Sequence, residues 1–260
     1  MKMIKRSLPI PTSQSERTLR ILLPSDYENS KEFYRVMYLH DGQNLFEDET
    51  SYSGHAWHIE ESLGRLGCDD MIVVGIDNSD LRLFEYSPWP CIPEVKRQFG
   101  IEIGGLGDVY ARWVVEQLKP YIDHEFRTLT DDKHTWIGGS SMGAYISAYI
   151  ATTYPKVFKH VGIFSLASWF NEEAFLSHLD SLSIDTNQTF FISVGRKESS
   201  LIDDAENQAY IKNSHNFYKL LQRHGVEHIT YIETDDGHHE LAWRKVFPDW
   251  LTFTRKKHIG

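Results

Sequence analysis

The sequence predicts an α/β fold with a mostly parallel, doubly wound sheet and an antiparallel start. Three observations lead to this prediction. Short apolar runs alternate with segments of helical periodicity along most of the chain, as in consecutive strand–helix–strand units. The first two apolar runs are joined only by Pro11-Thr-Ser-Gln14, which is too short for a parallel crossover and fits a hairpin turn. A turn rich in glycine and serine then joins one strand directly to a helix near the middle of the chain.

The elements follow from the apolar runs and from the residues that end them. Strands are expected at residues 3–10, 17–23, 33–39, 71–77, 160–166, 190–195 and 228–233, with a further strand starting at His134. Helices are expected at 57–66, at 106–118, from the central turn to Pro155, at 205–224 and at 239–253, the last broken or bent near Pro248. Residues 78–104 form a long irregular segment. The whole chain, 1–260, is expected to be a single domain.

Composition narrows the class of protein. The formal net charge of −10 argues against nucleic acid or an anionic membrane as the main partner. Cys68 and Cys91 suggest neither a disulfide framework nor a metal site. The N-terminus has no apolar stretch typical of a leader, and no run approaches the roughly 20 apolar residues of a membrane span. We therefore expect a soluble, cytoplasmic protein, and the sequence indicates no particular oligomeric state.

The central turn, Gly139-Ser-Ser-Met-Gly143, fits the pattern G-x-S-x-G with Ser141 in the reactive position. Ser140 does not fit, because Met142 stands where its second glycine should be. A serine on a sharp strand-to-helix turn has strained backbone angles, and the two backbones approach so closely that only glycine fits two residues to either side. Such a turn presents the hydroxyl at the positive end of a helix, beside backbone N–H groups. The pattern predicts a nucleophilic serine.

A serine hydroxyl is a weak nucleophile and needs a base that a third group holds in place. Two loops that follow expected strands carry suitable side chains, one at residues 195–198 and one at residues 236–240. The order serine, acid, histidine along the chain is that of the α/β-hydrolases. The base is His238 or its neighbour His239, and the acid is one of three carboxylates: Glu198, Asp203 or Asp204.

Four stretches together resemble one family. They are the turn around Ser141, the run from Tyr38 to Phe46, Gly75-Ile-Asp-Asn78, and Gly237-His238 with Trp243 five residues further on. In this order they resemble the putative-esterase family of α/β-hydrolases, which includes enterochelin esterase-like proteins, esterase D, feruloyl esterases and mycolyltransferases. The resemblance covers nearly the whole chain, from about Arg17 to Phe253. Ala144 and Arg196 depart from the family pattern, where a glycine and a small residue are commoner.

The resemblance implies a role for particular residues. Ser141 would be the nucleophile, His238 the base and Glu198 the acid. The backbone N–H groups of Met142 and Gln43 would form the oxyanion hole. The segment beginning at Arg82 resembles the family's Arg-x-x-Glu-Tyr motif, so it would supply substrate-binding residues, namely Arg82, Tyr86 and Trp89.

Several side chains near these positions could instead have a purely structural role. Arg82 and Glu85 could equally form a surface ion pair, and Trp169 with Phe170 could form a second pocket wall or simply pack. His40 and Asp41 are expected to shape their loop, because adjacent side chains usually diverge. His238-His239-Glu240 lacks the ligand spacing and the second cluster of a zinc site, so we expect neither a metal nor another cofactor.

The function expected from the sequence is that of a serine carboxylesterase acting on soluble short-acyl or aryl esters through an acyl-enzyme. Two alternatives would use the same three groups, namely an acyltransferase and a siderophore trilactone esterase. A third alternative is a non-catalytic binding member of the fold, because a fold alone does not define an activity. A complete set of serine, histidine and acid argues against this last alternative.

Overall fold

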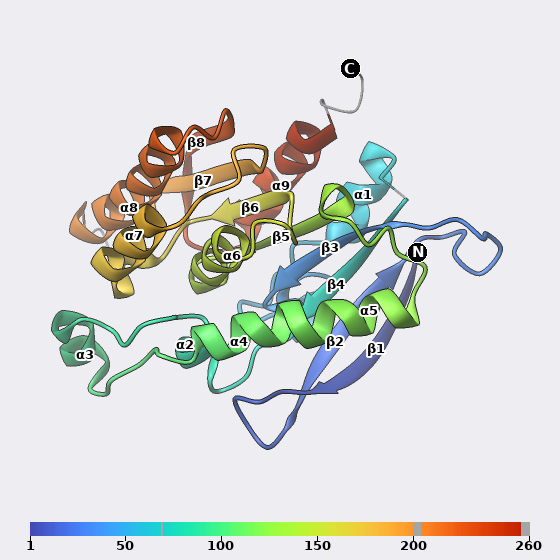
Figure 1. Cartoon of the computed structure of the whole chain (residues 1–260), viewed down its shortest axis with the longest axis horizontal. Coiled ribbons are helices and arrows are strands. Elements are labelled where there is room, and N and C mark those ends of the chain that lie inside the picture. Colours follow the sequence, from blue (N-terminus) through green and yellow to red (C-terminus); the bar gives the residue numbers. More distant parts are fainter. Residues whose placement is uncertain (69, 200–203, 256–260) are drawn as a thin grey trace.

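The computed structural model describes residues 1–68, 70–199 and 204–255, with the side chains of 204–206 left out. The described residues form one eight-stranded sheet in the order β1-β2-β4-β3-β5-β6-β7-β8 (Figure 1). The strands are β1 (Lys2–Pro9), β2 (Glu16–Leu23), β3 (Arg35–His40), β4 (Met71–Ile76), β5 (Thr135–Ser140), β6 (His160–Phe164), β7 (Thr189–Lys197) and β8 (His228–Gly237).

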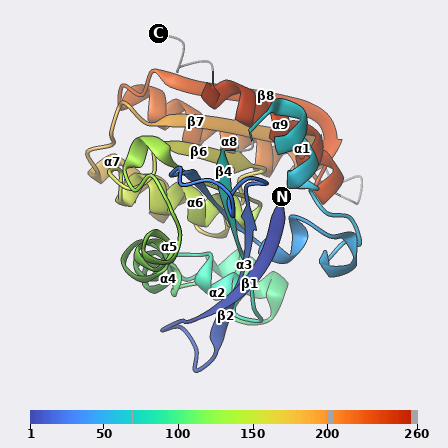
Figure 2. The same cartoon turned by 90° about the vertical axis from the view of Figure 1, so that its right-hand side faces the viewer.

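The sheet has an antiparallel edge and a parallel body. β1 and β2 form a hairpin in which Lys2 lies opposite Leu23, and β2 also pairs antiparallel with β4. Every other neighbouring pair, from β4–β3 to β7–β8, is parallel. Figure 2 shows the hairpin on the side of the sheet away from β7 and β8. The predicted fold class, a mostly parallel α/β sheet with an antiparallel start, is confirmed.

Helices cover both faces of this sheet. They are α1 (Ile59–Leu66), α2 (Arg82–Glu85), α3 (Pro93–Phe99), α4 (Gly107–Trp113), α5 (Lys119–Glu125), α6 (Met142–Thr153), α7 (Glu172–Ser181), α8 (Asp204–Arg223) and α9 (Glu240–Arg255). One buried apolar core contains residues of α4 to α8, and a second contains residues of α1 and α9. Because β3 to β7 lie between the two cores, their residues are buried almost without interruption, as is typical of doubly wound folds. No described helix has the length and apolar character needed to cross a membrane.

Several elements differ from the sequence-based expectation. Residues 78–104, expected to be irregular, contain the short helices α2 and α3, and α3 begins at Pro93, a residue favoured in the first helical turn. The helix expected to end at Leu118 continues to Glu125, because a π-helical turn at Val114–Leu118 precedes Pro120 and accommodates a ring that would otherwise clash with the preceding turn. Helix α7 has no counterpart among the expected elements; Asn171 caps it by accepting a hydrogen bond from the N–H of Ala174. Helix α9 passes through Pro248 as one element, so of the two expected outcomes there, a break or a bend, the break is wrong.

Candidate active site

Ser141 lies in a strained turn between β5 and α6. Its backbone angles are φ 57° and ψ −122°, a combination that non-glycine residues rarely adopt. Hydrogen bonds hold it there, because its N–H donates to the carbonyl of Phe164 at 2.9 Å and its carbonyl accepts from Tyr145 at 3.1 Å. A Cβ on Gly139 would come within 2.8 Å of the Gly143 backbone, so the glycines of the motif are required by close approach. The turn therefore joins strand to helix with a strained serine and a close approach of the two backbones.

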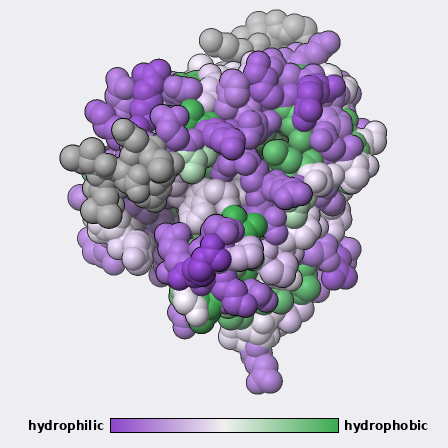
Figure 3. Space-filling view, turned by 90° about the vertical axis from the view of Figure 1, so that its left-hand side faces the viewer, coloured by the Kyte–Doolittle hydropathy of each residue, from purple (hydrophilic) through white to green (hydrophobic). Residues whose placement is uncertain are grey.

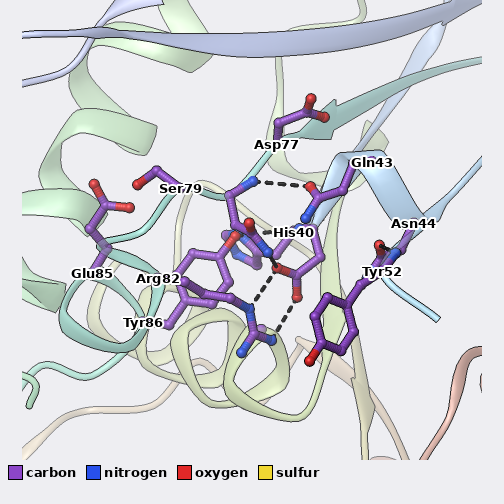
Figure 4. A network of polar contacts seen from close by, with 12 residues as sticks. His40, Gln43, Asn44, Tyr52, Asp77, Ser79, Arg82, Glu85 and Tyr86 are labelled. Carbon is purple, nitrogen blue, oxygen red and sulfur yellow. Dashed lines mark hydrogen bonds and ion pairs between the residues drawn. The ribbon is translucent and has the colours of Figure 1, made fainter. Parts of the chain in front are cut away.

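Helix α6 begins directly after Ser141, and a 3₁₀ helix begins after Asp41, which approaches Gly143 of the same turn. Met142 is the first residue of α6, so its N–H has no partner within that helix. Gln43 lies in the first turn of the 3₁₀ helix Gly42–Asn44, and its side-chain Oε1 accepts a hydrogen bond from the N–H of Asn78 at 3.1 Å. This bond turns the amide toward the loop after β4, while the Gln43 backbone stays in the helix start (Figure 4). The N–H of Met142 thus lies at the start of α6, where helices favour an anion, and Gln43 lines the same cavity as Ser141.

His238 and Glu198 are joined by a hydrogen bond. His238 Nδ1 lies 2.6 Å from Glu198 Oε2, and the Glu198 side chain is buried, with the whole residue only 2% exposed. The imidazole packs edge-on against Trp243 at 4.9 Å between ring centroids, and its ring is tilted against that of Tyr210 at 4.8 Å. With Nδ1 held by the carboxylate, Nε2 is the ring nitrogen left for proton transfer. The arrangement matches a base oriented by an acid.

A cavity of about 630 Å³ contains Ser141, His238 and Gln43 in its wall. Its other lining residues are mostly polar: Asp41, Asn44, Tyr52, Ser53, Asn78, Ser79, Asp80, Arg82, Ser140, His239, Glu240 and Trp243. The structure thus brings the proposed nucleophile and base, which are distant in sequence, to one concave surface. Among the described residues, no group of histidine, cysteine, aspartate or glutamate side chains is placed to hold a metal ion.

The alternative base, His239, has a different position from His238. Its Nδ1 accepts a hydrogen bond from the N–H of Ala242 at 3.2 Å, so the ring caps the first turn of α9. His239 also lines the cavity, but the hydrogen bond that the structure gives its ring is to the start of α9 and not to a carboxylate. The alternative acids, Asp203 and Asp204, lie outside the residues whose side chains the structure describes.

His40 and Asp41 do diverge. Asp41 Oδ1 and Oδ2 each accept a hydrogen bond from Arg82 at 2.8 Å, and Oδ1 accepts another from Asn78 at 2.6 Å (Figure 4). Burial opposes the charge of Asp41, but Arg82 and Asn78 together keep its pKa below the usual value. The His40 ring turns to the hydroxyl of Tyr110 at 3.0 Å. Its burial lowers its pKa to about 3, so it stays neutral.

The predicted substrate segment is divided between the cavity and the protein interior. Arg82 lines the cavity, whereas Tyr86 is fully buried and its oxygen accepts a hydrogen bond from the N–H of Asp41 at 3.3 Å. Trp89 packs instead against Tyr149 and His178. The prediction that Tyr86 and Trp89 contact a substrate is therefore not matched by this cavity, because their rings are used to pack the segment.

Arg82 and Glu85 do not form the ion pair considered from sequence. Arg82 pairs with Asp41, while Glu85 is buried and accepts two hydrogen bonds, both of 2.8 Å, from Arg17 on β2. Figure 4 shows Glu85 and Tyr52 on opposite sides of this network. Trp169 stacks on Phe170 at 4.2 Å between ring centroids, consistent with packing in the 3₁₀ helix Ser168–Phe170.

Sequence reasoning missed two groups near the site. Tyr52 lines the cavity and is 93% exposed, although it lies in a loop with no motif. Ser165 lies directly after β6 and contacts Glu198. Ser165 could have been predicted from its position, because ligands bind at the carboxyl ends of parallel strands in open α/β sheets.

The described fold is that of the α/β-hydrolases, with an antiparallel start followed by parallel strands and with helices on both faces of the sheet. Within that class, the chain belongs to the family described as "Putative esterase", whose model matches residues 10–254. Membership supports the hydrolysis of carboxylic esters.

Individual proteins similar to this chain are distant in sequence. The uncharacterized protein YbbA of Bacillus subtilis (strain 168) is 24% identical over 240 residues, which cover 90% of this chain and 92% of YbbA. A ferulic acid esterase structure has a TM-score of 0.73 at 18% identity and covers 98% of both chains. The BES protein from Bacillus cereus has a TM-score of 0.74 at 17% identity, covering 97% of this chain and 94% of its own. At these identities the structural likeness concerns the fold.

Proposed function

We propose that this protein is a serine carboxylesterase in which Ser141 is the nucleophile, His238 the general base and Glu198 the acid that orients it. The observation that carries the proposal is the 2.6 Å hydrogen bond between the buried Glu198 carboxylate and His238, at a cavity that also contains the strained Ser141. Esterase family membership supports the reaction class.

In the first half of the reaction, Ser141 Oγ attacks the ester carbonyl carbon while His238 Nε2 takes the hydroxyl proton. The imidazolium that forms is stabilised by Glu198 on its other nitrogen. The negative charge on the carbonyl oxygen is met by the backbone N–H groups of Met142 and Gln43. His238 then donates its proton to the leaving alcohol, and Ser141 is left as an acyl ester.

In the second half, water enters and His238 Nε2 removes its proton as it attacks the acyl carbonyl. Collapse of the second tetrahedral intermediate releases the carboxylic acid and returns the proton to Ser141. An alcohol in place of water would give acyl transfer with the same groups.

The cavity wall indicates the kind of ester. A volume of about 630 Å³ suits a small molecule. Asn44, Asn78 and Ser79 line it beside the rings of Tyr52 and Trp243, so a compact substrate with polar and flat groups suits it better than a long alkyl chain. Arg82 adds a cationic group whose Nε and Nη2 are bound to Asp41, which fixes its orientation. On the face shown in Figure 3, hydrophobic residues form small separate patches, unlike a lipid-binding surface.

The aromatic side chains in the cavity wall are Tyr52 and Trp243. Tyr86 and Trp89, which the sequence predicted to contact the substrate, are not among its lining residues. The exposed Tyr52 ring offers a face on which a flat acyl or alcohol group can stack. We therefore keep short-acyl and aryl esters as the proposed substrates.

The test is a panel of soluble nitrophenyl esters of increasing acyl length, together with feruloyl esters, assayed by release of the alcohol or acid. The proposal predicts turnover of short-acyl or aryl members and a decline for long acyl chains. Absence of turnover across the panel, with a protein that is folded by circular dichroism, would contradict the proposed activity. A preference for long acyl chains would contradict the substrate class alone.

A further inference from the structure

Behind Glu198 lies a second layer of hydrogen bonds centred on Ser165. This residue follows β6 and is 2% exposed. Its Oγ lies 2.7 Å from Glu198 Oε1 and 2.9 Å from Trp243 Nε1. Ser165 does not line the cavity that contains Ser141. It can therefore influence the site only through the groups that it contacts.

The direction of these hydrogen bonds is fixed by chemistry. The indole N–H of Trp243 can only donate, so the Ser165 oxygen accepts from it. The single hydroxyl hydrogen of Ser165 is then left to point at Glu198 Oε1. The result is a directed chain from Trp243 through Ser165 to Glu198.

The two oxygens of Glu198 have separate partners. Oε1 accepts from Ser165 and also from the N–H of Gly195 at 2.6 Å. Oε2 is left for Nδ1 of His238 at 2.6 Å. Since two donors from different parts of the sheet fix Oε1, the carboxylate plane cannot rotate without breaking them. This arrangement holds Oε2 in line with the imidazole.

The backbone at Ser165 is also unusual. Its φ of 55° lies in the left-handed region, where a serine costs on the order of 1 kcal/mol and a glycine costs nothing. The conformation is held by its N–H, which donates to the carbonyl of Ser193 at 2.7 Å. A hydroxyl is thus present at a position that backbone geometry alone would assign to glycine, which indicates that the hydroxyl contributes to the site.

Trp243 connects the acid and the base. Its indole N–H binds Ser165, and its ring packs edge-on against the His238 imidazole at 4.9 Å between centroids. One side chain therefore contacts the base directly and the acid through Ser165.

We propose that Ser165, aligned by Trp243, is a positioning residue that orients Glu198 toward His238. This inference rests on the proposed serine esterase function and adds a residue to it. Ser165 does not contact the cavity, so its loss should lower kcat and leave KM nearly unchanged. A merely structural role would instead lower stability without this split.

The experiment compares Ser165→Ala and Ser165→Gly with the wild type. Ser165→Gly removes the hydroxyl but relieves the backbone strain at a φ of 55°, which offsets part of the cost of leaving Trp243 Nε1 without its acceptor, so the variant should stay folded at the assay temperature, as checked by circular dichroism. Ser168→Ala is the matched control: Ser168 is 1% exposed, lies three residues away, and its Oγ has no hydrogen-bond partner among the described residues. Ser168→Ala should keep the wild-type kcat.

For both Ser165 variants we expect kcat on a nitrophenyl ester to fall about 10- to 100-fold, as for the loss of a hydrogen bond to a charged group, with KM changed less than about twofold. In proton NMR, the low-field signal of the His238 Nδ1 proton, assigned by its loss in His238→Ala, should move upfield or broaden. A folded Ser165→Gly with wild-type kcat would overturn the proposal. So would an equal loss of kcat in Ser168→Ala.

Two controls separate this proposal from the proposed function. If Ser141→Ala retains the wild-type rate, the nucleophile is wrong, whatever the Ser165 variants do. The NMR signal needs no substrate, so it reports on the Glu198–His238 bond even if no tested ester is turned over. An unchanged signal in folded Ser165→Gly would contradict the positioning role by itself.

Discussion

Glu198 and His238 lie 40 residues apart in sequence, yet the Oε2 of one is 2.6 Å from the Nδ1 of the other. Their loops follow β7 and β8, which are parallel neighbours at one edge of the sheet. The register of these strands is irregular between Gly195 and Lys197, just before the acid. Because such irregularities redirect side chains, this one accounts for how Glu198 turns inward while Arg196 stays on the surface.

The acid can be tested with Glu198→Gln. This change keeps the shape of the side chain, but an amide in place of the carboxylate cannot stabilise the imidazolium and can hold the wrong tautomer. We expect kcat to fall by about 10³- to 10⁴-fold with little change in KM. The measurement is steady-state hydrolysis of a nitrophenyl ester. Unchanged turnover would assign the acid to Asp203 or Asp204.

The choice between the two adjacent histidines follows from their contacts. His238→Ala removes the group bound to Glu198, so we expect at least about a 10³-fold loss of kcat. His239→Ala removes the acceptor for the Ala242 N–H, so it should lower the stability of the fold by about 1 kcal/mol and activity only modestly. Turnover and urea unfolding of both variants provide the comparison, and the opposite ranking in turnover would make His239 the base.

Substitutions of Tyr52 and Trp89 test where the substrate binds. Tyr52 lines the cavity and Trp89 packs against Tyr149, so only Tyr52→Ala should change the ranking of acyl and aryl esters by kcat/KM. Trp89→Ala should destabilise the fold and preserve the ranking. Ester panels and thermal unfolding of both variants give the readouts. A changed ranking in Trp89→Ala alone would return the substrate wall to the segment predicted from sequence.

The burial of His40 should make the free energy of unfolding depend on pH. Its folded pKa is about 3 because of burial, below the value of about 6.5 for an unfolded histidine. Between these values the unfolded chain binds the extra proton, so the His40 contribution is full above about pH 6.5 and is lost as pH falls toward 3.

Replacing this histidine should make the fall in unfolding free energy from pH 7 to pH 5 smaller by about 2 kcal/mol. The comparison is urea unfolding of wild type and His40→Gln at both pH values. The groups that face His40 are Asp41, Arg82, Tyr86 and Tyr110, and all four remain in the variant. An equal fall in both proteins would contradict the buried neutral His40.

The sequence predicts the parts of the site that depend on short motifs and on the order of the strands. G-x-S-x-G specifies close backbone approach within a few residues, so the sequence alone locates the turn at Ser141. The loops after β7 and β8 can be located because parallel strands end at one edge of the sheet. The parallel direction of most strands follows from the alternation of strands and helices.

Contacts between distant segments cannot be predicted in the same way. Arg17 on β2 pairs with Glu85, and this buried pair is set by the antiparallel position of β2 beside β4. Trp89 is expected at the cavity because its segment leaves a strand end, but the ring fits between α6 and α7. The sequence of residues 78–104 has no periodicity that indicates which side chains are buried. Its length and composition therefore reveal only that the segment is ordered.

The whole proposed reaction depends on Ser141 being an activated nucleophile. The most direct test is the intact mass of the protein after reaction with a fluorophosphonate, which labels only an activated serine, followed by mapping of the modified peptide. We predict one adduct, on Ser141, in the wild type and in Ser140→Ala, and none in folded Ser141→Ala. An adduct that persists in Ser141→Ala, or a wild type that takes up no label, would contradict the proposed role of Ser141.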